Sequence, residues 1–555
     1  MPAADATAPG ALAIEALTVA LPPGADRPLA LRNVSLRLAP GEILCVVGES
    51  GSGKSVMATA VMGLLAPGLR IVSGRILLSG TDLASLSEEG LRRVRGRRVA
   101  MVFQEPMTAL NPLMTVGAQL AEMWRTHTDL AGAEIAARSL EALREVALPD
   151  PEGALRAFPH ELSGGQRQRA MIAMALALEP EALICDEPTT ALDVTTQAQV
   201  LALVRDLQRR RGTAVLFITH DFGVVAEIAD RVAVMQRGVL VEEGPVSRVL
   251  TAPAHDYTRR LLAAVPPLRA PPARRLGSEA ALEVRGLSKT YGAAGLFRRR
   301  RATRALDDVS LTLRRGTTLG VVGESGSGKS TLARCVVGLL AADGGEIRVA
   351  GAPLPRKRAE AAGLVQMVFQ DPYASLNPRR RAGEQVAQGP VAAGVPRAEA
   401  VARTRELFAL VGLDPAAVSR FPHEFSGGQR QRIGIARALA MRPQVLVADE
   451  PVSALDVSVQ AQVLELLRDL RARLGLSTLF ITHDLRVAAQ VCDEVAVMRN
   501  GAVVEAGPVA EVFARPRHDY TRSLLAAVPG REAPGLGDGP PPSMVAAAGA
   551  RPAGE

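Results

Sequence analysis

The chain has 555 residues, which exceeds what a single hydrophobic core usually supports and predicts two or more domains. Hydrophobic residues make up 48% of the composition and charged residues 22%, which is typical of a chain that folds and excludes an intrinsically disordered protein. The formal net charge of +8 is modest for this length, so it does not indicate a nucleic-acid-binding protein.

The beginning of the chain, residues 1–11, has neither the basic flank nor the apolar core of an export signal, and we expect a flexible N-terminus there. No apolar run reaches the roughly 18–20 residues that are needed to cross a bilayer. These features predict a protein that stays in the cytoplasm.

Short apolar runs alternate with longer helical patterns along each half of the chain. In the first half we expect strands over 42–48, 182–187 and 213–220, with a helix over 197–210 before the third of these strands. Such alternation predicts an α/β fold with parallel strands. Phosphate-binding loops lie at the carboxyl ends of such strands, and the glycine-rich and charged stretches of this sequence fall there.

The stretch GESGSGKS occurs at 48–55 and again at 323–330, and both copies satisfy the P-loop pattern GxxxxGK[ST]. The first copy follows the strand-like LCVV and precedes the helix-compatible VMATAVMGLL, as the pattern requires. Backbone N–H groups, the helix dipole and the lysine are expected to bind the phosphates of a nucleotide, and a simple glycine-rich turn is the alternative. The predicted ATP-binding residues are Gly48, Ser50, Gly51, Ser52, Gly53, Lys54 and Ser55, then Gly323, Ser325, Gly326, Ser327, Gly328, Lys329, Ser330 and Thr331.

An apolar run ends in two acidic residues in each half, LICDE and LVADE. We expect Asp186 and Asp449 to orient the shell of a Mg²⁺ ion, which Ser55 and its counterpart in the second P-loop would also hold. The following residues, Glu187 and Glu450, can act as general bases on a water molecule in line with the γ-phosphate. An ordinary strand end is the alternative for each pair of acids.

Most of one half returns in the other half in the same order. From the serine of SGGQ onward the offset between the copies is constant at 263 residues, and HDYTR at 255–259 returns at 518–522. We therefore expect one domain over 12–265 and another over 281–529. The Pro/Arg/Ala-rich stretch 266–280 is predicted to be a linker, and the Gly/Pro/Ala-rich stretch 530–555 a flexible tail.

The cysteines are far apart in the sequence and form no CxxC pair. Most lie in apolar runs, which predicts small core side chains; a metal or redox role is the alternative, and it would need ligands that the fold brings together. These residues are Cys45, Cys185, Cys335 and Cys492.

The segments LSGGQ at 162–166 and FSGGQ at 425–429, together with the motifs above, resemble the ATP-binding cassettes of membrane transporters. The resemblance covers roughly 12–265 and 281–529, and it implies tandem P-loop NTPase cassettes. Each would have a RecA-like α/β core, an antiparallel β subdomain and a helical signature subdomain. The signature residues would face the γ-phosphate bound by the opposite cassette, and an ordinary helix N-cap is the alternative. They are Ser163, Gly164, Gly165, Gln166, Ser426, Gly427, Gly428 and Gln429.

Two further pairs of residues match positions of this family. Gln104 and Gln370 resemble its metal- and water-sensing glutamine, which also relays cassette closure to the membrane domain. His220 and His483 resemble its switch histidine, and contact with the γ-phosphate is what the resemblance implies. A buried structural histidine at a strand end is the alternative.

The resemblance extends to the adenine side and to the loop between the sites. Tyr291 matches the aromatic residue that the family stacks on adenine, whereas the first half has Leu21 or a neighbour there. Adenine stacking is therefore expected in the second half only, with apolar contact as its substitute in the first. Asp193 and Asp456 resemble the loop that links the two sites, and a helix cap is their alternative role.

Cassettes of this family work as head-to-tail pairs, so the resemblance implies an intramolecular cassette dimer. Each ATP would lie between the P-loop of one cassette and the signature of the other. The first site would join Lys54, Asp186, Glu187 and His220 to 426–429, and the second Lys329, Asp449, Glu450 and His483 to 163–166.

Finer details resemble the branch that serves dipeptide, oligopeptide, glutathione and nickel importers, among them FQEPMTALNP, DEPTTALDV and HDYTRRLLAAVP. This resemblance implies an ATPase with ATP and Mg²⁺ as cofactors, two integral-membrane permease subunits and an extracytoplasmic solute-binding protein as partners, and no nucleic acid. It also implies a peripheral location on the cytoplasmic face of the inner membrane. The alternatives are an importer of nickel or another small solute and a soluble two-cassette translation factor, whose long charged linker is missing here.

Overall fold

The computed structural model describes residues 11–25, 27–190, 192–269, 276–292, 303–371, 373–453, 455–534 and 536. They form two compact units, one made mainly from the first 265 residues and one mainly from residues 266–528. Residues 1–10, 270–275 and 537–555, which hold most of the predicted flexible N-terminus and tail and the middle of the predicted linker, lie outside the described residues.

The first unit is built around a six-stranded sheet with the order β10-β9-β3-β8-β7-β6. Five strands are parallel and β10 pairs antiparallel with β9 at one edge. Every residue of the three central strands β3, β7 and β8 is buried, as expected of parallel strands covered on both faces. The strands are β3 (Ile43–Val47), β6 (Val99–Val102), β7 (Ala182–Asp186), β8 (Ala214–Ile218), β9 (Arg231–Gln236) and β10 (Val239–Pro245).

A second, antiparallel sheet of the first unit has the order β2-β1-β4-β5. Its strands alternate between buried and exposed positions over much of their length, because only one face packs on a core. The strands are β1 (Leu12–Ala20), β2 (Leu29–Leu38), β4 (Arg70–Leu78) and β5 (Thr81–Asp82).

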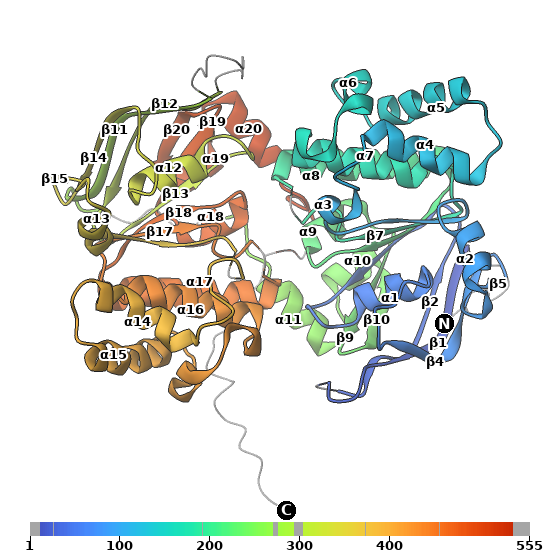
Figure 1. Ribbon diagram of the computed structural model, residues 1–555, viewed down its shortest axis with the longest axis horizontal. Coiled ribbons are helices and arrows are strands. Elements are labelled where there is room, and N and C mark those ends of the chain that lie inside the picture. Colours follow the sequence, from blue (N-terminus) through green and yellow to red (C-terminus); the bar gives the residue numbers. More distant parts are fainter. Residues whose placement is uncertain are drawn as a thin grey trace, which may run out of the picture. The chain divides into compact units, whose positions relative to one another are not determined.

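Four helices of the first unit, α4, α5, α6 and α7, pack on one another and form a separate group beside the sheets (Figure 1). Helix α1 is shorter than the sequence predicts: it ends at Val61, and Gly63 follows in a left-handed conformation that terminates helices. The predicted helix over 197–210 lies within α8. The helices are α1 (Lys54–Val61), η1 (Leu83–Ser85), α2 (Glu88–Val94), α3 (Pro106–Ala109), α4 (Val116–His127), α5 (Gly132–Glu145), α6 (Pro151–Arg156), η2 (Pro159–Glu161), α7 (Gly164–Leu176), α8 (Val194–Arg211), α9 (Phe222–Ile228), α10 (Val246–Thr251) and α11 (Asp256–Ala264).

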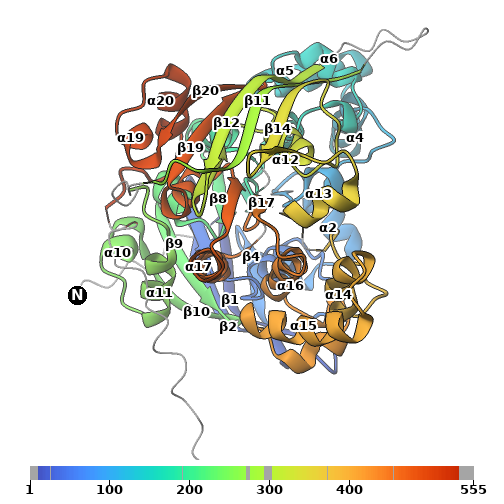
Figure 2. The same ribbon diagram turned by 90° about the vertical axis from the view of Figure 1, so that its left-hand side faces the viewer.

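The second unit repeats both sheets, with the orders β16-β17-β18-β13-β19-β20 and β12-β11-β14-β15. Its helices α14, α15 and α16 gather as their counterparts do in the first unit (Figure 2). The strands are β11 (Ala280–Tyr291), β12 (Thr303–Arg314), β13 (Thr318–Val322), β14 (Gly344–Val349), β15 (Ala352–Pro353), β16 (Val365–Val368), β17 (Val445–Asp449), β18 (Ser477–Ile481), β19 (Glu494–Arg499) and β20 (Ala502–Pro508). The helices are α12 (Lys329–Val336), α13 (Arg358–Leu364), α14 (Ala382–Ala392), α15 (Arg397–Leu410), η3 (Pro415–Ser419), η4 (Pro422–Glu424), α16 (Gly427–Leu439), α17 (Val457–Leu474), α18 (Leu485–Val491), α19 (Val509–Ala514) and α20 (Asp519–Ala526).

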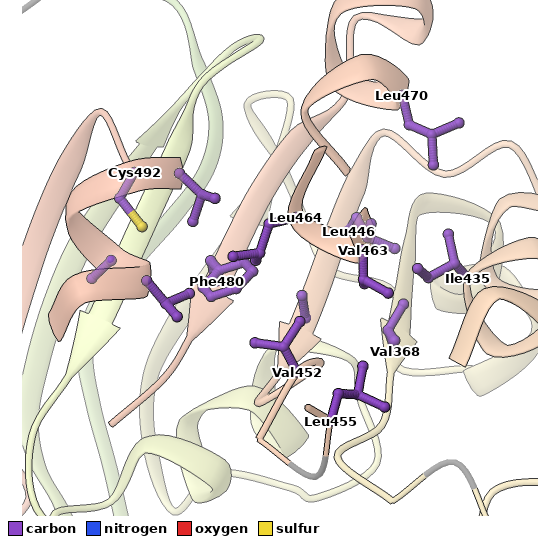
Figure 3. Close-up of a cluster of buried hydrophobic side chains, with 14 of the residues drawn as sticks. Val368, Ile435, Leu446, Val452, Leu455, Val463, Leu464, Leu470, Phe480 and Cys492 are labelled. Atoms are coloured by element: carbon purple, nitrogen blue, oxygen red, sulfur yellow. The ribbon is translucent and has the colours of Figure 1, made fainter. Parts of the chain in front are cut away.

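The core of the second unit joins the parallel sheet to its helices. Figure 3 shows Leu446 and Phe480 of two neighbouring strands packed against Val463 and Leu464 of α17. These side chains are almost completely buried, so the carboxyl ends of the strands are held in fixed positions. The strand ends are therefore a rigid platform for the residues that follow them.

All four cysteines are buried and none forms a disulfide, as the sequence predicts for core side chains. Burial raises the pKa of the Cys335 thiol to about 11, and it raises the pKa of the other three further. The thiols are therefore protonated at neutral pH and chemically inert.

Among the described residues, none of the helices combines the length and the apolar character that a membrane-crossing segment requires.

Candidate nucleotide-binding site of each unit

Each GESGSGKS stretch forms a tight loop between a buried strand and a helix, β3 and α1 in the first unit and β13 and α12 in the second. Gly53 has a φ of 103° and caps α1 without any side-chain hydrogen bond, which leaves the first N–H groups of the helix for a ligand. A Cβ on Gly48 would lie 2.2 Å from the carbonyl oxygen of Met235. The loop fits an anion such as a nucleotide phosphate because its glycines leave the backbone exposed at the helix N-terminus.

The other predicted P-loop residues occupy this loop or the first turn of the helix in both units. The second unit repeats the geometry, with φ of 106° at Gly328. Ser52 and Ser327 are buried, whereas Gly51 and Gly326 are exposed. The positions on the loop are Ser50, Gly51 and Ser52, then Gly323, Ser325, Gly326 and Ser327, and Thr331 lies on α12.

The P-loop lysines are buried and turned back on the loop. Lys54 Nζ donates to the carbonyl oxygens of Gly48 at 2.7 Å and Glu49 at 3.0 Å. Lys329 Nζ makes the two corresponding bonds at 2.7 Å each, to Gly323 and Glu324. Burial lowers the pKa of Lys329, although nearby carboxylates oppose this effect. Both ammonium groups are thus held at the point where the loop would surround a phosphate.

Oxygen ligands lie beside each P-loop. Ser55 Oγ donates to Oδ1 of Asp186 at 3.1 Å, and Ser330 Oγ donates to Oδ1 of Asp449 at 3.4 Å. Burial raises the pKa of Asp186, and burial with the neighbouring Glu450 carboxylate raises the pKa of Asp449 to about 6. Hydroxyl and carboxylate oxygens are the donor set that Mg²⁺ prefers, so these residues fit that ion.

Three predicted catalytic residues of the first unit converge on one carboxylate. Gln104 Nε2 donates to Oε2 of Glu187 at 3.2 Å, and His220 Nδ1 lies 3.1 Å from the same oxygen. Thr190 Oγ1 donates to it at 3.0 Å. These residues come from the ends of three parallel strands, β6, β7 and β8, which the sheet order places side by side.

The second unit brings together the same three residues. Gln370 Nε2 donates to Oε2 of Glu450 at 2.8 Å, and His483 Nδ1 lies 3.2 Å from it. Ser453 differs from its threonine counterpart, because its Oγ donates to the backbone oxygen of Glu450. Burial alone lowers the pKa of His483, but the hydrogen bond and the charge of Glu450 outweigh it and raise that pKa.

Both glutamates are held in a strained backbone conformation. Their φ values are 46° for Glu187 and 45° for Glu450, in the left-handed region that residues with a side chain rarely adopt. Such strain is concentrated at functional sites, where the surrounding structure over-determines it. Burial tends to raise the pKa of Glu187, but His220 and Lys54 outweigh burial and lower it to about 2. The carboxylate is therefore ionised at neutral pH.

The signature segments begin helices in both units. Ser163 Oγ accepts from Gln166 N at 3.3 Å, and Gln166 Oε1 accepts from Ser163 N at 2.8 Å, which is a reciprocal capping box at the start of α7. Ser426 and Gln429 cap α16 in the same way. The N-cap role that the sequence left as the alternative is thus present, and Gly164, Gly165, Gly427 and Gly428 form the first helical turn behind the caps.

The predicted adenine side differs between the units. Tyr291 ends β11 and is 40% exposed, with its hydroxyl 3.5 Å from Thr331 Oγ1 on the P-loop helix. Leu21 directly follows β1 and packs against the apolar core of the first unit. The first unit also holds Arg27 nearby, whose guanidinium donates to the carbonyl oxygen of Gly51 in the P-loop.

The aspartates expected to link the sites lie at helix starts. Asp193 directly precedes α8, and Asp456 occupies the N-cap position of α17. Asp456 makes no side-chain capping hydrogen bond to α17.

Several contacts with the site residues were not foreseen from the sequence. The hydroxyl of Tyr257 accepts a hydrogen bond from the P-loop, and Tyr520 does the same in the second unit. Both tyrosines lie in the duplicated HDYTR stretch, to which no role was assigned from the sequence. Nothing in the sequence indicated the contact of Arg27, because it joins an irregular loop to the P-loop.

Comparison with family models gives two results. The model of the ABC transporter family matches residues 31–190 and 306–453, and these segments contain both P-loops and both signatures. The model described as the C-terminal region of oligopeptide/dipeptide transporters matches residues 241–300 and 504–554, and these segments contain both HDYTR stretches.

Curated relatives match along most of their length. A peptidoglycan transport ATP-binding protein of Agrobacterium fabrum is 50% identical over 93% of this chain and 96% of its own. A glutathione import ATP-binding protein of Escherichia coli is 47% identical over 93% of this chain and 89% of its own. Among solved structures, cbiO1 of Clostridium perfringens, described as part of an ABC transporter complex, is 29% identical and covers 43% of this chain and 92% of its own, with a TM-score of 0.37.

The family match covers both units, and the fold agrees with the expected pair of α/β cassettes, each with a parallel core sheet, an antiparallel sheet and a helical group. The chain therefore belongs to the ABC transporter family, as an ATPase with two fused cassettes that is coupled to transport.

Proposed function

We propose that this chain is the ATP-hydrolysing subunit of an importer for peptides of the dipeptide, oligopeptide or glutathione type. The observation that carries the proposal is the match of both units to the C-terminal region of oligopeptide/dipeptide transporters. The names of the relatives agree with it, since one is named for peptidoglycan transport and another for glutathione import.

Each cassette turns over ATP to ADP and phosphate with the residues that the sequence predicted. Glu187 accepts a proton from the attacking water, and its carboxylate is ionised at neutral pH. Gln104 and His220 orient that carboxylate through Oε2. Glu450 with Gln370 and His483 performs the same task in the second cassette, and the signature residues complete the binding of the γ-phosphate.

Lys54 and Lys329 bind the nucleotide phosphates, helped by the N–H groups at the starts of α1 and α12. Mg²⁺, when bound, neutralises charge on the phosphate oxygens. The residues that would hold it are Ser55, Asp186 and Gln104 in the first cassette and Ser330, Asp449 and Gln370 in the second.

The partners in this proposal are two integral-membrane permease subunits and an extracytoplasmic solute-binding protein. The chain is peripheral on the cytoplasmic face of the inner membrane, where the permeases receive the energy of hydrolysis. In this proposal the solute is bound by these partners, and the cassettes supply the nucleotide chemistry.

Reconstitution tests the proposal. The chain is combined in proteoliposomes with two candidate permease subunits and a candidate solute-binding protein, and uptake of labelled dipeptide, oligopeptide and glutathione is followed. We expect uptake of one of these solutes that depends on ATP on the cassette side and is lost in the double variant Glu187→Gln, Glu450→Gln. ATP-dependent uptake of nickel alone, or co-sedimentation with ribosomes in place of any uptake, would overturn it.

A further inference from the structure

The HDYTR stretch is duplicated in the sequence, yet its residues have no role in the proposed hydrolysis of ATP. In each unit it forms the start of the last helix, α11 at 256–264 and α20 at 519–526. In the sequence its tyrosine lies 208 residues after Glu49 of the P-loop in the first unit and 196 residues after Glu324 in the second.

The start of α11 is fixed by hydrogen bonds on several sides. The buried carboxylate of Glu242 accepts from the backbone N–H groups of Ala254 at 2.7 Å and His255 at 3.1 Å. His255 Nδ1 accepts from Tyr257 N at 3.1 Å, and Arg259 Nη1 donates to the carbonyl oxygen of Ala254 at 3.0 Å. The tyrosine is thus presented by a rigid helix start.

The second unit reproduces this arrangement. The carboxylate of Glu505 accepts from Arg517 N at 2.8 Å and His518 N at 3.1 Å, and His518 Nδ1 accepts from Tyr520 N at 3.1 Å. Arg522 Nη1 donates to the carbonyl oxygen of Arg517 at 3.0 Å. Because two copies of one sequence pattern give the same bonds, the arrangement is a property of the pattern.

The side chain so presented reaches the P-loop. Tyr257 is 3% exposed, and its hydroxyl accepts from Glu49 N at 3.1 Å. Tyr520 is 6% exposed, and its hydroxyl accepts from Glu324 N, also at 3.1 Å. Each P-loop is therefore bonded to the C-terminal segment of its own unit.

The bonded N–H belongs to the peptide group that joins Gly48 to Glu49. The carbonyl oxygen of that same peptide group accepts from Lys54 Nζ at 2.7 Å. A peptide group is planar, so the tyrosine that fixes its N–H also fixes the direction of its C=O. The peptide group between Gly323 and Glu324 has the same two bonds, to Tyr520 and to Lys329 at 2.7 Å.

We propose that Tyr257 and Tyr520 are positioning residues of the two nucleotide sites. Each hydroxyl holds one peptide group of the P-loop, and that peptide group holds the lysine ammonium where the phosphates bind. The C-terminal segment of each cassette thereby sets the affinity for nucleotide phosphates. The proposal rests on the proposed binding of ATP at these loops.

Binding measurements on the full chain test it with Tyr257→Phe, Tyr520→Phe and the double variant. Removing the hydroxyl leaves the peptide group free to turn, so the ammonium loses its fixed position. We expect the Kd of Mg·ADP at the altered site to rise about fivefold, the equivalent of one hydrogen bond worth about 1 kcal/mol. In steady-state hydrolysis the KM for ATP rises by a similar factor while kcat stays within about twofold. The backbone N–H of Glu49 or Glu324 exchanges faster with deuterium.

Two controls separate positioning from a structural role. Leu261→Ala removes a buried side chain from the same helix, so it lowers the melting temperature but leaves the Kd of Mg·ADP unchanged. Adenosine lacks phosphates, so its affinity is equal in wild type and in the tyrosine variants. A Kd within twofold of wild type in both tyrosine variants would overturn the proposal, as would an equal rise in Leu261→Ala. Absence of ADP binding in the wild type would instead refute the proposed function.

Discussion

The two cassettes share the residues proposed for hydrolysis but differ on the predicted adenine side. The Oε2 atoms of Glu187 and Glu450 each lie within 3.2 Å of a glutamine amide nitrogen and a histidine ring nitrogen. By contrast, the residue after β1 is Leu21, whereas its counterpart is Tyr291 at the end of β11. The proposed site for hydrolysis thus has the same hydrogen bonds in both cassettes, whereas the predicted contact with adenine differs between them.

The end of β11 is also held more firmly than the end of β1. Asp343 accepts from Lys289 Nζ and from Thr290 N, each at 2.7 Å, and these two residues directly precede Tyr291. The position that corresponds to Lys289 in the first cassette is Val19, which is fully buried. The second cassette therefore presents an aromatic ring on a strand end that is held by Asp343, whereas the first cassette has a leucine there that packs on its apolar core.

The largest expected effect tests the shared half of this comparison. We expect Glu187→Gln and Glu450→Gln each to slow ATP turnover of the full chain about 10²-fold or more, because an amide cannot accept the proton from water. Phosphate release measures this. Glu122→Gln, on the exposed face of α4, is the matched control and keeps wild-type turnover.

Each glutamate variant has an outcome that breaks the comparison. Wild-type turnover in one of them would show that this cassette is not catalytic. About half of the wild-type rate in both would show that the cassettes work independently.

A medium effect tests the adenine side. Tyr291→Leu should raise the Kd of ATP at the second site about tenfold, since stacking of a base on an aromatic ring contributes about 1–3 kcal/mol. The reciprocal Leu21→Tyr should tighten ATP binding at the first site. Titration calorimetry measures both, and tripolyphosphate, which has no base, is the control ligand. Equal losses of ATP and tripolyphosphate affinity in Tyr291→Leu would assign the tyrosine to the phosphates.

The smallest expected effect concerns an ion pair that only the first cassette has at this position. Arg98 Nε donates to Oε1 of Glu181 at 2.5 Å, whereas the corresponding residues of the second cassette are Leu364 and Gln444. The hydrogen bond from Arg98 lowers the pKa of Glu181. This stabilisation is therefore present above the ordinary glutamate pKa of 4.5 and is lost as the pH falls through the lowered value.

Glu181→Gln should lower the stability of the first cassette by about 1 kcal/mol or less at neutral pH, since the pair is partly exposed. The difference from wild type should shrink in thermal unfolding measured over a series of pH values falling below 4.5. Gln444→Glu is the matched control, because it places a carboxylate at the same position without an arginine. A difference that persists unchanged at low pH would show that the pair contributes through packing and not through charge.

Local sequence determined the loops and helix starts of this protein. GESGSGKS needs its glycines because a Cβ on Gly48 would clash with the backbone, and SGGQ forms a capping box from residues three apart. Strands such as β3 and β7 were predicted because they are short apolar runs; the only polar residue in them is the aspartate that ends β7 at the site. These features depend on neighbours in the chain, so a pattern is sufficient to find them.

Tertiary structure alone decided which of these pieces meet. Gln104 lies 83 residues before Glu187 in the sequence, and His220 lies 33 residues after it. Both side chains contact the same carboxylate oxygen of Glu187 because the parallel sheet places the ends of their strands side by side. The hydroxyl of Tyr257 reaches the P-loop amide across 208 residues of sequence. No local pattern encodes such contacts, since they arise when the packed core fixes the strands and the last helix against one another.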